Sequence, residues 1–307
     1  PLWSRGLGDV YKRQMEGCSK YCSFCVVPYT RGDEVSRKPE QIFDEVARLA
    51  EQGVSEITFL GQNVNSYKMP YKGRILRLSD LIEITSHIDG IERIRYTTSH
   101  PLDMTDDLIE AYQYIPQLVS QLHLPVQSGS NKILEKMKRN YTIDIFHDAV
   151  QRIKYFRPDL RVSSDFIVGF PGESHDDFMK TMDLVNEIEF DSSFSFIYSK
   201  RPGTPASKLE DMTPLEEKKE RLNTLQDRLN HFHRNHSKSM VGSIQRCLVT
   251  GIAKIRSDQL QARTVCNRVV NFDLENIGFI GKLVDIEITE ALSYSLLGTL
   301  HNPRGKI

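Results

Sequence analysis

EGCSKYCSFCVVPYTRG, residues 16–32, contains three of the five cysteines in this 307-residue chain. Cys18, Cys22 and Cys25 follow the spacing CxxxCxxC. Three thiolates so close together can each bind one iron of a cubane cluster, which leaves the fourth iron open to a small molecule. A structural zinc ion needs a fourth ligand, and the nearest histidine in the sequence is His87. The segment therefore predicts a catalytic [4Fe-4S] site, with a zinc site as the alternative.

The overall composition is that of an ordinary globular protein. The chain has 40 Lys+Arg against 41 Asp+Glu, and 39% of its residues are hydrophobic. It has no run of about 18 apolar residues, which excludes a transmembrane helix, and no signal-peptide pattern, so we expect a cytoplasmic location. The two other cysteines, Cys247 and Cys266, match no ligand spacing and are interpreted as incidental thiols.

Extended apolar runs alternate with helical patterns between residues 16 and 196. Strands are expected just before Cys18 and at 56–60, 94–98, 121–125, 163–168 and 193–198, and helices at 39–51, 79–88, 106–114, 132–138, 143–156 and 175–188. Such alternation indicates right-handed βαβ units and a parallel sheet. Six units are too few for an eightfold barrel. We therefore expect an α/β fold, either a partial (β/α)6 TIM-like barrel or an open sheet, with ligands at the carboxyl ends of the strands.

The C-terminal part has a different pattern. A long charged helix is predicted at 214–238, followed by short glycine-punctuated strands at 245–250, 260–264, 269–272, 282–288 and 296–300. Such strands indicate a small antiparallel β-barrel. We expect the first domain at residues 15–238, the β-barrel at 239–302 and a tail at 303–307.

The first fourteen residues, PLWSRGLGDVYKRQ, show neither helical nor strand periodicity. Residues 9–14 resemble the translated end of a transposon adapter used in sequencing libraries. We interpret residues 1–14 as a non-native scar and leave them out of the predicted fold. The alternative is a native N-terminal arm. If the scar is real, the natural protein begins further upstream.

The cysteine segment and six further blocks resemble the MiaB type of the radical S-adenosylmethionine (SAM) methylthiotransferases. The resemblance covers residues 15–300, and its blocks are VVPYTRG (26–32), LGQNVNSY (60–67), TTSHP (97–101), HLPVQSGS (123–130), SSDFIVGFPGE (163–173) and YSKRPGTPA (198–206). It implies a radical SAM barrel with a [4Fe-4S] cluster on the three cysteines, whose open iron binds SAM. It also implies methylthiolation of N6-isopentenyladenosine at position 37 of tRNA, with the electrons supplied by a reducing donor.

The resemblance also implies a set of cofactor-binding residues. Phe24 would lie along the adenine of SAM, and residues 61–63 would contact its amino-acid part. Residues 127–129 would offer short polar groups and let the protein backbone approach the cofactor closely. The implied set is Phe24, Gly61, Gln62, Asn63, Gln127, Ser128, Gly129, Gly169 and Glu173. Each also has a structural interpretation, as a core aromatic, a turn residue or, for Glu173, a favourable first-turn charge.

Several other polar residues have both a functional and a structural interpretation. Arg31, Arg37 and Arg139 are candidates to contact a carboxylate or a phosphate, but we expect each to be a solvated surface arginine. We expect His100 and His123 to be strand-end histidines with satisfied hydrogen bonds rather than ligands.

The C-terminal β-barrel resembles the TRAM domain, which implies RNA binding. Residues 214–307 carry a net positive charge and the remainder a net negative charge, which agrees with an RNA partner. The candidates for phosphate contact are Arg246, Lys254, Arg256, Arg263 and Arg268. No membrane partner is expected, and we expect a monomer.

The chain departs from the full-length family pattern, which includes an N-terminal domain with three cysteines for a second iron–sulfur cluster. Nothing here corresponds to that domain. We therefore expect the chain to bind and cleave SAM without inserting sulfur. Two alternatives remain: a sister methylthiotransferase for threonylcarbamoyladenosine or a ribosomal-protein aspartate, and a non-enzymatic RNA-binding module with a structural metal.

Overall fold

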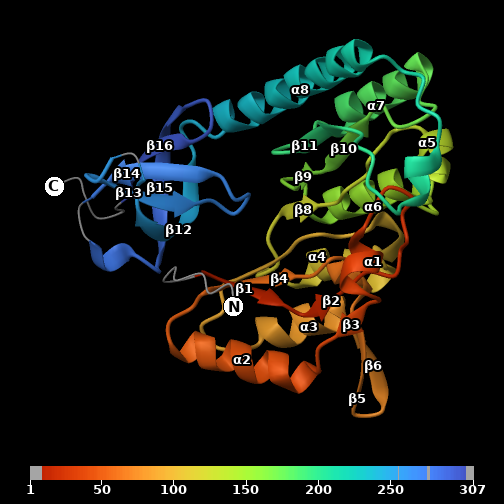
Figure 1. Ribbon diagram of the computed structural model, residues 1–307. Helices are drawn as coiled ribbons and strands as arrows, with labels where there is room; N and C mark the ends of the chain where they lie inside the picture. The colour runs from red at the N-terminus through yellow and green to blue at the C-terminus, as the bar shows by residue number, and fades with distance from the viewer. Residues whose placement is uncertain (1–8, 255, 275–276, 302–307) are drawn as a thin grey trace.

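The computed structural model describes residues 9–254, 256–274 and 277–301, with side chains from residue 14 onward (Figure 1). Its first part is a partial α/β barrel. β1 (Asp9–Arg13), β4 (Glu56–Leu60) and β7 (Arg93–Tyr96) form a parallel sheet in the order β1-β4-β7. A bridge from Ile94 to Leu118 continues this sheet toward the second half of the barrel.

The second half of the barrel is built from two parallel pairs. β8 (Gln121–His123) pairs with β9 (Arg161–Ser163), and β10 (Asp165–Val168) pairs with β11 (Phe194–Ile197). A bridge from Gln127 to Phe166 joins the two pairs. The prediction of a partial barrel is therefore confirmed.

Strand alternation separates the two faces of the barrel. In β4, Ile57 and Phe59 are fully buried in the main hydrophobic core, whereas Glu56 and Thr58 face the opposite, inner side. Helices cover the outer face (Figure 1). They are α2 (Pro39–Glu51), α3 (Leu78–Ser86), α4 (Asp106–Tyr114), α5 (Asn131–Lys136), α6 (Ile143–Phe156) and α7 (His175–Ile188).

The first strand differs from the prediction. β1 lies inside the segment that the sequence analysis left out, and it pairs with β4 from Asp9↔Glu56 to Arg13↔Leu60. The residues just before Cys18 form only the short strand β2 (Met15–Glu16), which pairs with β3 (Val35–Ser36). A five-residue edge strand with charged ends has too little hydrophobic periodicity to stand out in the sequence. Whether residues 1–14 are native stays a prediction.

Other local elements were not predicted. They are the helix α1 (Val27–Arg31), the hairpin of β5 (Lys68–Tyr71) and β6 (Arg74–Arg77), and the short 3-10 turns η1 (Val64–Ser66), η2 (Pro101–Asp103), η3 (Pro205–Lys208) and η4 (Ile277–Phe279). These elements are short, so their sequences show little periodicity.

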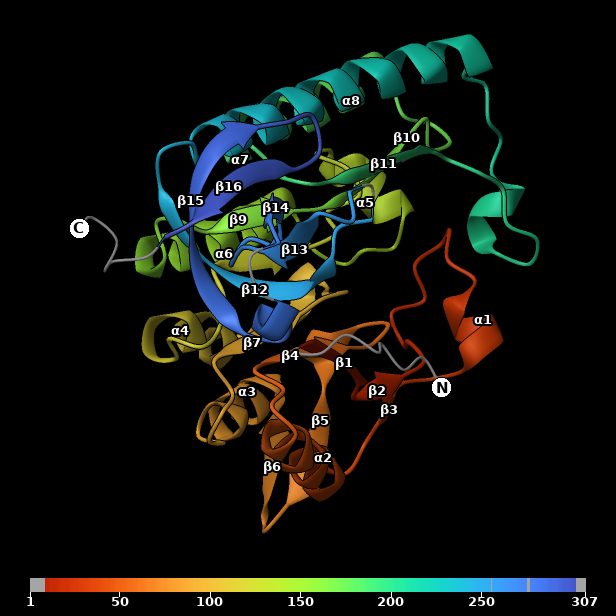
Figure 2. The same cartoon turned by 90° about the vertical axis from the view of Figure 1, so that its left-hand side faces the viewer.

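A long helix links the partial barrel to the C-terminal domain. α8 (Leu215–Lys238) packs on α7 and on β11, along one side of the fold (Figure 2). A helix of 24 residues is about 36 Å long. It thus connects the two ends of the partial barrel. Within the described residues, no helix has the length and apolar character needed to cross a membrane.

The C-terminal domain is a closed barrel of five strands in the order β12-β13-β14-β16-β15. One pair, β14 with β16, is parallel, unlike the antiparallel pairing that we expected. The barrel has its own buried core, which includes Cys247. Its strands are β12 (Ile244–Ile252), β13 (Gln259–Arg263), β14 (Val269–Asp273), β15 (Leu283–Ala291) and β16 (Leu296–Leu300).

The C-terminal barrel contacts the amino ends of the parallel strands. Arg93 and Arg95 of β7 donate hydrogen bonds to its backbone carbonyls, Arg95 reaching Thr264 at 3.1 Å. Glu56 at the start of β4 holds both arginines in ion pairs. The C-terminal barrel therefore lies at the end of the partial barrel opposite the carboxyl ends of the strands.

Candidate active site

The three cysteines of the CxxxCxxC segment line one cavity of about 370 Å³. We call it the cysteine cavity. The loop that carries them starts at Gly17, whose φ is +74° and where an added Cβ would lie 2.0 Å from the Asp33 carbonyl oxygen. The Cys18 N–H donates to the Gly32 carbonyl at 3.1 Å, which closes the loop. The remaining wall comes from the carboxyl ends of the parallel strands, as the fold class predicts.

Burial disfavours the charged forms of these thiols in the absence of a cation. It raises the pKa of Cys18 to about 11 and also raises the pKa of Cys25. A coordinated metal deprotonates a thiol outright, so the thiols suit a cluster better than free nucleophile chemistry. In the described part of the chain, no three Cys, His, Asp or Glu side chains form a preassembled metal site.

Arg139 is a buried cation beside the cysteines. Its Nη1 lies 3.6 Å from the Cys22 sulfur, and its Nη2 donates to the Pro125 carbonyl at 2.6 Å. Only 6% of its surface is exposed. The prediction of a solvated Arg139 was therefore wrong, and this buried cation instead lies against the Cys22 sulfur.

Four buried polar atoms around the cysteine cavity have no hydrogen-bond partner among the described residues. They are Gln62 Oε1, Asn63 Oδ1, Ser99 Oγ and His100 Nε2, and all four residues line the cavity. Buried polar groups are normally hydrogen-bonded, because an unpaired one costs free energy. Several unpaired atoms on residues that line one cavity therefore indicate a polar ligand, which fits the amino and carboxylate groups of SAM.

His100 is neutral. Burial, together with the charges of Arg139 and Lys20, lowers its pKa to about 2. Its Nδ1 accepts a hydrogen bond from the Leu102 N–H at 3.2 Å, so the proton of the neutral ring lies on Nε2. His100 thus offers an unpaired N–H donor at the cavity, and the prediction of a satisfied strand-end histidine was wrong.

The backbone at two strand ends adopts an unusual conformation. Thr98 has a φ of +67° and Gln127 a φ of +73°, and both residues line the cysteine cavity. A left-handed conformation is rare for residues other than glycine and is especially costly for β-branched threonine. Such strain concentrates at functional sites, where the surrounding structure maintains it.

Five of the nine implied cofactor-binding residues line the cysteine cavity with the cysteines: Phe24, Gly61, Gln62, Asn63 and Gln127. The Asn63 Nδ2 donates to Asp103 at 2.7 Å and to Glu34 at 3.1 Å, which leaves its carbonyl oxygen as the unpaired atom. Ser128 is fully buried. Gly129 packs on α7, where an added Cβ would lie 2.4 Å from the Lys180 carbonyl oxygen.

Gly169 and Glu173 lie elsewhere and form a structural link to α8. The Gly169 N–H donates to Glu173 Oε2 at 2.7 Å, and Arg221 of α8 donates to the same oxygen at 2.8 Å. Burial raises the pKa of Glu173, whereas the hydrogen bonds from the Gly169 N–H and from Arg221 act to lower it. Because this carboxylate is already paired, the structure does not support Gly169 and Glu173 as cofactor contacts.

Sequence reasoning assigned no role to several residues that line the cavity. Lys20 forms an ion pair with Asp103 at 2.7 Å, and Ser99 and Asp165 lie at the ends or inner faces of strands. The TTSHP block gave the only signal, because it places Thr98 to His100 directly after a predicted strand. Asp165 also approaches His123, at 3.6 Å.

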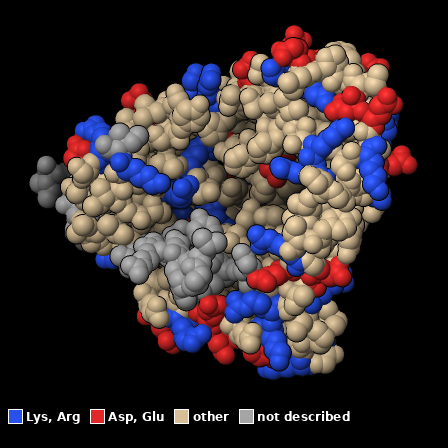
Figure 3. All heavy atoms as spheres, in the orientation of Figure 1, with Lys and Arg blue, Asp and Glu red and all other residues tan. Residues whose placement is uncertain are grey.

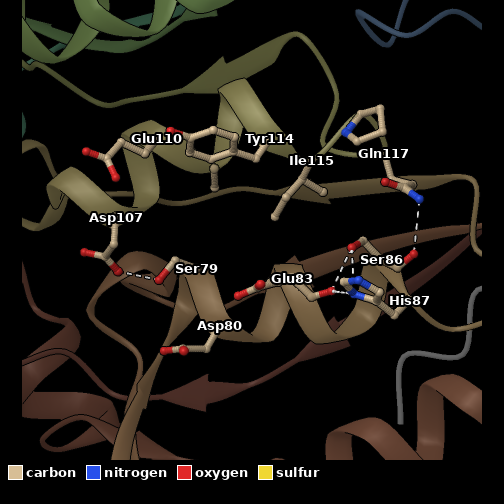
Figure 4. Close-up of a pocket in the computed structure, with 12 residues that line it drawn as sticks. Ser79, Asp80, Glu83, Ser86, His87, Asp107, Glu110, Tyr114, Ile115 and Gln117 are labelled. Atoms are coloured by element: carbon tan, nitrogen blue, oxygen red, sulfur yellow. Dashed lines mark hydrogen bonds between the residues drawn. The ribbon is translucent and has the colours of Figure 1, made fainter.

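A larger cavity of about 610 Å³ lies between α3 and α4, away from the cysteines (Figure 4). We call it the outer cavity. Several of its polar side chains are hydrogen-bonded to another side chain or to backbone: Ser79 donates to Asp107, His87 Nδ1 contacts the Glu83 carbonyl oxygen at 2.8 Å, and Gln117 donates to a backbone carbonyl. The outer cavity therefore gives no comparable indication of a ligand.

The predicted RNA-binding residues fall into two groups. Lys254, Arg246 and Arg256 are exposed, although Arg246 and Arg256 form surface ion pairs. Arg263 donates to the Asn267 carbonyl at 3.0 Å within a turn. Lys and Arg side chains line a hollow of the surface next to the C-terminal barrel (Figure 3).

Arg268 does not belong to that surface. It is buried, and both of its terminal nitrogens donate to Asp191 of the partial barrel at 2.7 Å. The prediction that Arg268 contacts phosphate was therefore wrong, because an ion pair between the two domains uses its charge. Cys266 lies 3.3 Å from the same guanidinium group, and Cys247 is buried in the barrel core, so neither belongs to the cysteine cavity.

Comparisons with known proteins agree with this geometry. The model of the Radical SAM superfamily matches residues 14–185, and that of the TRAM domain matches residues 238–301. A tRNA-2-methylthio-N(6)-dimethylallyladenosine synthase of Hahella chejuensis is 55% identical over 97% of this chain and 67% of its own length. One of Chromohalobacter salexigens is 56% identical over 94% of this chain and 65% of its own length. The chain thus spans about two thirds of the length of these relatives.

Solved structures show the same fold at low sequence identity. The radical SAM methyltransferase TsrM of Kitasatospora setae is 16% identical, with a TM-score of 0.51 over 66% of this chain and 38% of its own. Coproporphyrinogen III oxidase (HemN) of Escherichia coli is 14% identical, with a TM-score of 0.51 over 84% of this chain and 67% of its own. With the cysteine cavity and the family matches, these findings show that the chain belongs to the radical SAM superfamily and, within it, to the family of the tRNA-2-methylthio-N(6)-dimethylallyladenosine synthases.

Proposed function

We propose that the intact protein adds a 2-methylthio group to N6-dimethylallyladenosine, also called N6-isopentenyladenosine, at position 37 of tRNA. The observation that carries this proposal is the cysteine cavity, which is lined at the strand ends by three cysteines and by four residues with an unpaired buried polar atom. The names of the relatives favour this substrate over those of the sister methylthiotransferases. Because the proposed substrate is a tRNA, we also propose a cytoplasmic location, and we propose that the protein is a monomer.

Cys18, Cys22 and Cys25 would hold a [4Fe-4S] cluster that has one open iron. When bound, the cluster supplies one-electron reductive cleavage of SAM, with the electron coming from a separate donor protein. The chain's own residues would bind and orient SAM, with the side-chain oxygens of Gln62 and Asn63 as hydrogen-bond acceptors and His100 Nε2–H as a donor.

Sulfur insertion is proposed to need the part of the relatives that this chain does not span. Of its five cysteines, three line the cysteine cavity and two lie in the C-terminal barrel, so none remains to bind a second cluster. The C-terminal barrel would contact tRNA phosphates through Arg246, Lys254 and Arg256. Metal analysis of the reconstituted chain distinguishes the cluster from the zinc-binding alternative.

The test is an anaerobic assay of the reconstituted chain with SAM, a strong reductant and tRNA that carries dimethylallyladenosine. Chromatography is expected to detect 5′-deoxyadenosine and methionine, and nucleoside mass spectrometry to detect no 2-methylthio product. Absence of SAM cleavage in protein loaded with iron and sulfide would contradict the proposed function. Formation of the 2-methylthio product would instead overturn the proposal that sulfur insertion needs a further part.

A further inference from the structure

The inner face of β11 exposes two aromatic side chains. Phe194 and Phe196 are 60% and 57% exposed, while Ile197 packs against the main core on the side that α8 covers. Residues two apart on a strand share a face, so both rings point toward the inside of the partial barrel. Folding does not require two large exposed rings side by side, and such patches mark interaction sites.

Phe196 also lines a small pocket of about 170 Å³, here called the side pocket. Its walls are mainly apolar. Phe24 lines both the side pocket and the cysteine cavity, so the two spaces adjoin. Ile167 of β10 stands directly opposite Phe196 in the strand register. The side pocket is thus an apolar extension beside the proposed SAM site, smaller than the roughly 300 Å³ or more of typical ligand sites.

Tyr198 lines the side pocket and carries an unpaired polar group. It is 8% exposed, and its hydroxyl is buried without a partner among the described residues. Its ring packs edge-on against Phe170, with the centroids 5.1 Å apart. Burial, with the nearby charge of Asp211, raises the pKa of Tyr198, so the hydroxyl keeps its proton. A buried hydroxyl of this kind indicates a ligand with a hydrogen-bonding atom.

Two cations follow directly along the chain. Lys200 and Arg201 are both exposed, Arg201 lines the side pocket, and neither forms an ion pair with a described residue. Exposed aromatic rings beside unpaired cations are typical of surfaces that bind single-stranded nucleic acid, where rings contact bases and cations contact phosphates. A nucleotide whose adenine carries an apolar substituent therefore fits this surface: the rings suit its base, the apolar pocket suits its substituent and the cations suit its phosphates.

We propose that the side pocket receives the apolar N6 substituent of the substrate adenosine. Phe196 and Ile167 contact this five-carbon group, the Tyr198 hydroxyl bonds to the base, and Lys200 and Arg201 lie near the neighbouring phosphates. The inference rests on the proposed function, because it takes the substrate from there. It makes Phe196 a residue that distinguishes modified from unmodified adenosine.

The test measures binding of two RNA hairpins to the reconstituted chain by fluorescence anisotropy. The hairpins have the same anticodon-loop sequence and differ only in the N6-dimethylallyl group of one adenosine. Partial burial of five carbons is expected to favour the modified hairpin by about 10- to 100-fold. Phe196→Ala is expected to reduce that preference below about threefold, with little change for the unmodified hairpin. Its exposure in the fold makes this variant compatible with folding.

Phe194→Ala is the matched control, since Phe194 lies on the same strand and face as Phe196 but is not among the residues that line the side pocket. It is expected to keep the preference. Tyr198→Phe is expected to weaken binding of both hairpins by about 2- to 10-fold, the loss of one neutral hydrogen bond. Equal loss of preference in F194A and F196A would overturn the inference. The inference would also be overturned if the wild-type chain bound both hairpins equally. If that chain still cleaved SAM, the proposed SAM chemistry would stand.

Discussion

Two cavities of the partial barrel differ in how their polar groups are satisfied. The outer cavity, at about 610 Å³, is the larger, and its Ser79, Asp107 and His87 bond to one another or to nearby backbone. The cysteine cavity, at about 370 Å³, leaves four buried polar atoms unpaired beside three thiols. Unpaired buried groups persist only where something else compensates them. Chemistry, rather than size, therefore identifies the ligand site.

The first prediction removes a thiol and should have the largest effect. In Cys22→Ala, the cluster loses one of its three protein ligands, so iron content and SAM cleavage are expected to fall to background. Cys266→Ala, in the C-terminal barrel, is the control and is expected to retain both. Iron analysis of anaerobically reconstituted variants provides the measurement. Equal iron content in the two variants would contradict the assignment of the cavity.

A second prediction concerns Glu173, which the sequence suggested as a cofactor contact and the structure pairs with Arg221. In Glu173→Ala, the buried Arg221 loses its closest buried carboxylate, so we expect the free energy of unfolding to fall by about 3 kcal/mol or more. SAM affinity, measured under conditions where the variant stays folded, should be unchanged. A variant of normal stability with weakened SAM binding would show that Glu173 belongs to the cavity after all.

A third prediction compares a histidine from each cavity. His100→Ala removes an unpaired N–H donor from the cysteine cavity, and a hydrogen bond to a charged group contributes about 1.5–3 kcal/mol, so SAM should bind roughly 10- to 100-fold more weakly. His87→Ala, in the outer cavity, should leave SAM affinity unchanged. Equilibrium dialysis with the reconstituted variants measures both. Similar affinities in the two variants would remove the distinction between the cavities.

The smallest effect is expected in the outer cavity itself. Although burial opposes ionisation of Asp107, the hydrogen bond from Ser79 holds its pKa below the usual value. Ser79→Ala should therefore reduce stability by less than about 1 kcal/mol. The difference should be present above about pH 4 and shrink as the pH falls, because protonation removes the charge that the bond favours. Denaturant unfolding at several pH values tests this, and a change in SAM affinity would contradict it.

The contrast also shows what the sequence could reveal. The bounds of α2, α4, α6 and α7 match the predictions because these helices have strong hydrophobic periodicity. The cysteines and residues 61–63 are close in sequence or follow predicted strands, so their shared position could be inferred. The burial of Arg139 could not, because it depends on packing between distant segments.

Pairing between distant residues explains the wrong assignments. Glu173 and Arg221 are 48 residues apart, and Asp191 and Arg268 are 77 residues apart. Neither pair has a local pattern that links its members. Both arginines hold domains or helices together, and a sequence alone does not distinguish such an arginine from one that contacts RNA.

Cys18, Cys22 and Cys25 are proposed to hold a cluster with an open iron that binds SAM. The most direct test combines iron and sulfide analysis of the anaerobically reconstituted chain with electron paramagnetic resonance of the reduced protein, with and without SAM. A [4Fe-4S] cluster at these cysteines predicts about four irons per chain and a spectrum that changes when SAM is added. Zinc in place of iron, or a spectrum that SAM leaves unchanged, would contradict it.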